Sequence, residues 1–166
     1  KSIGCIGDTV TLNVKIDQRL EPLAPQTDGF SHSEVCYTDR SRVRYFTPRT
    51  NGSQYQWFVS GGSFTADSDP TSNEVFVNWG NSASGRIWYR EYNPLITDCE
   101  GYSDFLEVTI YSPIVPTPTI SDVLCNGEAN GAITLAISGG KGSDYTVAWS
   151  NGATGTSISG LVAGNY

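Results

Sequence analysis

Hydrophobic and polar residues alternate over short stretches along most of the chain, as they do in half-buried β-strands. Glycine and asparagine, the residues typical of tight turns, stand between these stretches, for example at Asn51-Gly52 and Gly61-Gly62. No segment shows a helical period, so the sequence predicts an all-β protein of short strands. The alternating segments are 10–16, 55–59, 75–79, 106–110, 133–137 and 145–149.

One pattern occurs twice in the chain. Residues 5–16 and 99–110 both read C-x-G-x-x-x-x-L-x-V-x-I, at an offset of 94 residues from Cys5 to Cys99. This offset is the length of a β-sandwich domain of roughly 100 residues. We therefore expect residues 1–16 to be the last strand of a preceding domain and residues 17–112 to form a complete sandwich.

A second internal similarity places a further domain at the end of the chain. Cys36 is followed by Tyr55-Gln56-Trp57, and Cys125 is followed at nearly the same spacing by Tyr145 and Trp149. Residues 119–166 are therefore predicted to begin another unit. The intervening residues 113–118 are rich in proline, which predicts a stiff, extended linker.

The charge of the chain excludes some classes of partner. Seventeen acidic and ten basic residues give a formal net charge of −7, which argues against nucleic-acid binding. The local basic group of Arg40, Arg42, Arg44 and Arg49 is interpreted as the solvated face of a strand. No apolar run approaches the roughly 20 residues that cross a bilayer.

Two strand patterns resemble a known family. The segments Y-Q-W-F-V-S-G-G (55–62) and V-F-V-N-W-G (75–80), with Cys36 and Cys99, are similar to the PKD-like domains of Bacteroidota surface proteins over residues 30–110. The resemblance implies tandem immunoglobulin-like, antiparallel β-sandwiches.

The last part of the chain resembles the SprB repeat. The motifs that carry this resemblance are C-N-G at 125–127, W-S-N-G-A-T at 149–154 and I-S-G-L-V-A-G-N-Y at 158–166. The resemblance implies a repeat module of a large secreted adhesin, exported by the type IX system to the surface of a Bacteroidota cell. The module would serve as a spacer and in adhesion, in gliding motility or surface attachment, beside neighbouring repeats and possible surface polysaccharides. The usual closing strand does not follow Tyr166, so this repeat is expected to be incomplete.

The four cysteines show no C-x-x-C spacing, which gives no support to a zinc site. Cys36 and Cys99 are the two that belong to one whole predicted domain, so we expect a disulfide between them worth about 4 kcal/mol. Cys5 and Cys125 would then be unbridged within this chain. The rival pairing, Cys5 with Cys36, would make residues 1–16 part of the central domain.

Few residues are candidates for chemistry. His32 is the sole histidine and no G-x-S-x-G turn accompanies it, so an enzyme is not expected. Asp67 and Asp69 have a D-x-D spacing that can begin a calcium site, although a solvated turn is favoured. No other cofactor is indicated.

The tryptophans suggest a second hypothesis. A sandwich normally buries a tryptophan at positions such as Trp57 and Trp149. Trp88 differs, because its neighbours Ile87 and Tyr89 occupy one face of their strand and Trp88 the other. Trp88, Tyr89 and Tyr92 are therefore candidates for stacking on sugar rings, as in an accessory carbohydrate-binding module of a secreted hydrolase.

Overall fold

The fold is all-β, as the alternating pattern predicts. A computed structural model describes residues 20–28, 33–96 and 98–166, and the strand expected at 10–16 lies outside these ranges. The described elements are β1 (Glu34–Val35), a 3₁₀ turn η1 (Tyr37–Asp39), β2 (Val43–Phe46), β3 (Gln54–Ser60), β4 (Gly62–Phe64), β5 (Glu74–Trp79), β6 (Ser84–Tyr92), β7 (Glu100–Tyr102), β8 (Leu106–Ile110), β9 (Val115–Ser121), β10 (Gly131–Ser138) and β11 (Ser157–Leu161).

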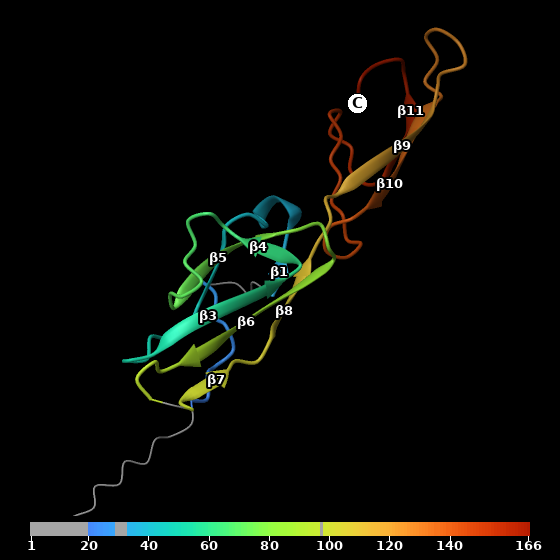
Figure 1. Ribbon diagram of the computed structural model, residues 1–166. Helices are drawn as coiled ribbons and strands as arrows, with labels where there is room; N and C mark the ends of the chain where they lie inside the picture. Colours follow the sequence, from blue (N-terminus) through green and yellow to red (C-terminus); the bar gives the residue numbers. More distant parts are fainter. Residues whose placement is uncertain (1–19, 29–32, 97) are drawn as a thin grey trace, which may run out of the picture.

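Strands β1 to β8 form two sheets that enclose one core. The larger sheet has the order β1-β8-β6-β3, with β7 also paired to β6, and the smaller sheet has the order β2-β5-β4. All named pairings are antiparallel except that of β1 with β8, which is parallel. Figure 1 shows these strands grouped in one body, with β9, β10 and β11 beyond one end of it.

The core of this first unit comes from the alternate residues of the strands that face inward. Tyr45, Val75, Ile87 and Tyr89 are fully enclosed, and Trp57 is also buried, as expected. Two tyrosines satisfy their hydroxyls inside the core, since Trp79 Nε1 donates to Tyr45 Oη at 3.0 Å and Tyr89 Oη lies 2.7 Å from Thr47 Oγ1. The core cluster contains Val35, Val43, Tyr45, Tyr55, Trp57, Val75, Val77, Trp79, Ile87, Tyr89, Val108 and Ile110.

The segment 20–28 contacts both sheets of the first unit. The backbone N–H of Gln26 donates to Phe46 O of β2 at 2.8 Å, while the carbonyl of Leu23 accepts a hydrogen bond from Tyr89 of β6. The backbone of Leu20 lies against Gly101 of β7. These contacts make residues 20–28 part of the first unit.

The second unit is a three-stranded antiparallel sheet with the order β11-β10-β9. Residues 115–118, expected to be linker, lie in β9, so the linker prediction is wrong for them. Pro116 pairs with Ile137 and Pro118 with Leu135 of β10. Because β9 is an edge strand, a proline that lacks an N–H can be accommodated without breaking the ladder. The connection between the units is therefore only the few residues between β8 and β9.

The predicted strand at 145–149 is also wrong. Those residues form a single bridge, Ala148 with Thr154, and Trp149 is only half-buried. Its Nε1 donates to the carbonyl of Gly155 at 2.8 Å, within its own turn. The second unit has a thin core, in which Ile158 and Leu161 are the buried hydrophobic residues among those described. A tryptophan here has no second sheet of the described chain to pack against.

Candidate ligand-binding face

The outer face of the larger sheet carries aromatic side chains on β3, on β6 and at the residue that precedes β8. In β6 the residues Ile87, Tyr89 and Glu91 are buried, so Trp88 points to the opposite face. The same alternation places Phe58 of β3 outside, directly opposite Trp88 in the ladder. Phe105 lies just before β8 and continues the line on the far side of Trp88.

We call Phe58, Trp88 and Phe105 the aromatic row. The Phe58 and Trp88 rings are stacked, with centroids 5.4 Å apart and an angle of 17° between their planes. Phe105 meets Trp88 edge to face, with centroids 5.1 Å apart. Phe105 is 55% exposed, and Phe58 and Trp88 are partly exposed. The row is thus a continuous apolar surface that runs across three strands and is open to solvent.

Two arginine–glutamate pairs flank the aromatic row. Arg86 is paired with Glu107 at 2.7 Å and its guanidinium lies over the Phe105 ring. On the other side Arg90 is paired with Glu100, and that hydrogen bond raises the pKa of Arg90 above its ordinary value. The Arg90 guanidinium also lies 4.7 Å from the Tyr92 ring centroid. The charges of these four groups cancel within the face.

The structure separates the three predicted stacking residues. Trp88 and Tyr92 lie on the outer face of β6, so they share one surface. Tyr89 does not, and its inclusion was wrong, because it faces the core and is fully buried. Burial raises the pKa of the Tyr89 hydroxyl, which binds Leu23 O and Thr47 instead of a ligand.

Three aromatic residues of this face were missed by the sequence reasoning. Phe58 alternates with buried Trp57 and partly buried Val59, so its outward orientation was available from the pattern. Phe105 and Tyr102, both more than half exposed, flank a break between two short strands. Only the pairing of β7 and β8 with the same strand β6 brings them to one face.

The two aspartates considered for calcium bind groups of the protein. Asp67 is ion-paired with Arg42 and accepts a hydrogen bond from Thr65 Oγ1 at 2.7 Å. Asp69 accepts two bonds from Thr71, at its N–H and its hydroxyl. These hydrogen bonds lower the pKa of both carboxyl groups, since they favour the charged form. The contacts are those of a solvated turn, and the described ranges contain no cluster of three or more potential metal ligands.

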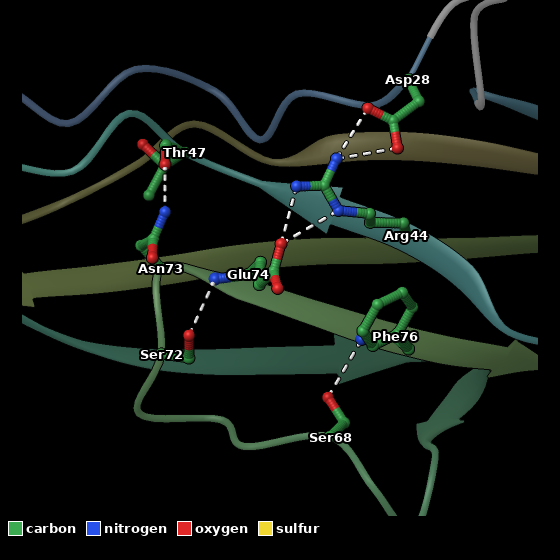
Figure 2. A network of polar contacts seen from close by, with 8 residues as sticks. All are labelled: Asp28, Arg44, Thr47, Ser68, Ser72, Asn73, Glu74 and Phe76. Atoms are coloured by element: carbon green, nitrogen blue, oxygen red, sulfur yellow. Dashed lines mark hydrogen bonds and ion pairs between the residues drawn. The ribbon is translucent and has the colours of Figure 1, made fainter.

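Two arginines of the basic group, Arg42 just before β2 and Arg44 within it, are paired with acidic neighbours. Arg44 pairs with Asp28 at 2.7 Å and with Glu74 at 2.6 Å, as Figure 2 shows. Both contacts raise the pKa of Arg44. The guanidinium of Arg42, paired with Asp67, also lies over the Phe76 ring. These arginines therefore leave little free positive charge for a phosphate backbone.

The expected disulfide between Cys36 and Cys99 does not form; both are free thiols. Cys36 follows β1, whose last residue pairs with Ile110 beside the Ala83 end of β6. Cys99 accepts a hydrogen bond from Asn93, beyond the other end of β6. The nine residues of β6 lie between these two positions and span about 30 Å, whereas a disulfide needs Cα atoms within about 7 Å.

Cys5, and with it the rival Cys5–Cys36 pairing, lies outside the described residues, as does His32. Cys125 is a free, exposed thiol. Among the described residues, no helix has both the length and the apolar character needed to cross a bilayer.

Comparison with known families identifies part of the second unit. Residues 117–154 match the family model of the SprB repeat, from β9 through the Trp149 turn. No curated protein matches the chain. The match supports the similarity predicted from the W-S-N-G-A-T motif and indicates a repeat module of the kind found in cell-surface proteins. The PKD-like resemblance of residues 30–110 stays a prediction.

Proposed function

We propose that this chain is a repeat module of a large secreted cell-surface adhesin, acting as a spacer and in adhesion, in gliding motility or surface attachment. The observation that carries the proposal is the SprB repeat match at 117–154, directly after a unit of two sheets. Export by the type IX system to the outer surface of a Bacteroidota cell follows from the same resemblance. Catalysis has no part in the proposal.

The arrangement of the two units supports a role as a spacer. They follow each other along the chain with a connection of only a few residues between β8 and β9, and the second lies beyond one end of the first (Figure 1). Each unit is held by antiparallel ladders, the longest being the seven-residue pairings β3–β6 and β9–β10. Serial units of this kind extend a distal binding site away from a cell, with neighbouring repeats as their partners.

Surface exposure on intact cells tests this proposal. An antibody against residues 33–166 should label living, unpermeabilised cells of the source organism, and brief external protease should remove the signal. A cytoplasmic enzyme and an outer-membrane lipoprotein of known orientation are the controls. Deleting the coding region in frame should reduce attachment or gliding. Labelling that appears only after permeabilisation would contradict the proposal.

A second candidate is an accessory carbohydrate-binding module of a secreted hydrolase. The exposed aromatic row is the observation that favours it, since a spacer needs no such surface. The complete reading frame separates the two candidates. Long arrays of repeats support the adhesin, whereas a catalytic domain in the same frame supports the hydrolase.

A further inference from the structure

We propose that the aromatic row is a binding site for an uncharged polysaccharide, which stacks across β3, β6 and β8 on Phe58, Trp88 and Phe105. The inference deepens the proposed adhesive function and rests on it for its biological meaning. It supplies what that function lacks, namely the chemical class of the ligand and the side chains that contact it.

The cost of exposing the row indicates a ligand. Soluble domains place large aromatic rings in their cores, and contiguous apolar patches on their surfaces commonly mark binding sites. Here Trp88 contacts both Phe58 and Phe105 on the outside of a sheet whose inner face is already filled. Phe105 is 55% exposed beside Trp88, and Tyr102, opposite Arg90 in the ladder, is 59% exposed. The aromatic row is not part of the core, so polar residues at these positions would leave the core packing unchanged.

The dimensions and composition of the face match a sugar chain. Neighbouring strands lie about 4.8 Å apart, so three strands present a row about 10 Å long, close to two sugar rings in a polymer. The C–H faces of sugars pack on aromatic rings. Gln56 and Ser60, both exposed on the same face of β3, lie on either side of Phe58 and supply hydrogen-bonding groups for sugar hydroxyls.

Charge complementarity selects an uncharged sugar over an anionic one. Arg86 and Arg90 are each paired with a glutamate, so neither offers a free positive charge to a uronate or sulfate group. The whole chain carries −7, which repels polyanions further. A cationic polymer would be attracted to the acidic surface generally and would not need the aromatic row.

A second copy of this chain fits the aromatic row less well than a polysaccharide does. A stable protein interface buries about 800 Å² on each partner. The apolar part of this face is three rings wide and is bounded on both sides by charged pairs, Arg86–Glu107 and Arg90–Glu100. Such a surface is too small and too polar at its edges for a stable dimer, although it is large enough for a sugar chain.

Affinity electrophoresis of the full chain tests the inference. The protein is run in native gels that contain soluble β-glucan, xyloglucan or mannan, in gels with polygalacturonate, and in gels without polysaccharide. At least one uncharged polymer should retard the chain, and polygalacturonate should not. Trp88→Ala and Phe105→Ala should each weaken binding about tenfold, the effect of removing one aromatic contact. Trp88→Phe should retain most of the binding.

The controls make each outcome decisive. Tyr37→Ala removes an exposed aromatic ring outside the row and should bind as the wild type does. Near-ultraviolet circular dichroism of every variant shows whether the fold is kept. Phe105→Ala is the variant least disruptive to the fold, because Phe105 lies at an exposed position. The inference is overturned if no uncharged polymer binds, if binding survives Trp88→Ala and Phe105→Ala, or if the row mediates dimers in sedimentation. Cell-surface labelling with no sugar binding would overturn it and leave the spacer function intact.

Discussion

Lys141, in the turn after β10, donates a hydrogen bond to the carboxylate of Glu34 in β1, so an ion pair joins residues 107 positions apart. Tyr111 Oη donates to the other oxygen of the same carboxylate at 3.1 Å. The backbone N–H of Gly140 also donates to Ser112 O at 2.9 Å. These contacts are polar, and they give the junction a specific geometry.

Breaking the Lys141–Glu34 pair should let the two units change their orientation relative to each other. In Lys141→Met, residual dipolar couplings should fit two different alignment tensors for β1–β8 and β9–β11, whereas the wild type should fit one. Asp144→Asn, an exposed change in the same loop, is the matched control. The urea midpoint of the first unit should not change, because exposed pairs contribute little to stability. Equal tensors in Lys141→Met would show that the pair does not orient the units.

The same ion pair predicts how the junction responds to pH. The hydrogen bond from Lys141 lowers the pKa of Glu34 from its ordinary 4.5, and the bond to Glu34 raises the pKa of Lys141 from its ordinary 10.5. The contribution of the Glu34 carboxylate to the stability of the junction is therefore complete above pH 4.5 and is lost as pH falls through its lowered pKa. The contribution of the Lys141 ammonium to the stability of the junction is complete below pH 10.5 and is lost as pH rises through its raised pKa. The ¹³C shift of the Glu34 carboxyl should report a higher pKa in Lys141→Met, and an unchanged titration would contradict the pairing.

Trp57 and Trp88 should differ sharply in their effect on stability. Trp57 is buried, its ring lies 4.7 Å from that of Tyr89, and its Nε1 donates to Ser72 O at 2.8 Å. Trp57→Ala should therefore cost about 3–5 kcal/mol of the free energy of unfolding. Trp88→Ala should cost much less, because the outer face of β6 is open to water. Urea denaturation measures both values, and a reversed order would mean that the inner and outer faces are exchanged.

Gly85 should not tolerate a methyl group. A Cβ at this position would overlap the Trp79 ring, and the carbonyl of Ser60 blocks it from the other side at 2.9 Å. Since Trp79 is buried, with its Nε1 bound to Tyr45, the ring has little room to move. Gly85→Ala should cost about 1–3 kcal/mol by overpacking. Gly164→Ala, where a Cβ meets only Tyr166 at ordinary distances, should be neutral in the same urea assay.

The cysteines of the first unit should be dispensable. Cys36 is exposed and Cys99 is half-buried, and neither belongs to the core cluster, so Cys36→Ser and Cys99→Ser should each change the free energy of unfolding by no more than about 0.5 kcal/mol. Non-reducing peptide mapping should recover no peptide linking residues 36 and 99. A loss near the 4 kcal/mol expected of a disulfide, or such a peptide, would show that the ladder of β1, β8 and β6 is wrong.

The alternating pattern predicted the inward-facing residues of β3, β5 and β8. Tyr55 and Trp57, Val75 and Val77, and Val108 and Ile110 are all buried as their spacing predicts. This succeeds because a strand has a period of two, which is a local property of the backbone. The SprB motif was likewise readable from the residues alone, and the family match at 117–154 includes its W-S-N-G-A-T part.

Only the tertiary structure decided which strands are neighbours. Cys36 and Cys99 were paired by their place in a repeat, but β1 runs parallel to β8 and leaves them at opposite ends of β6. The prolines at 116 and 118 predicted a linker, because the sequence alone does not show that β9 is an edge strand, where proline is tolerated. The aromatic row depends on the register of β3 and β8 against β6, since Phe58, Trp88 and Phe105 are far apart in the chain. Periodicity assigns a residue to a face, whereas partner and register are set by contacts between distant segments, which no local pattern contains.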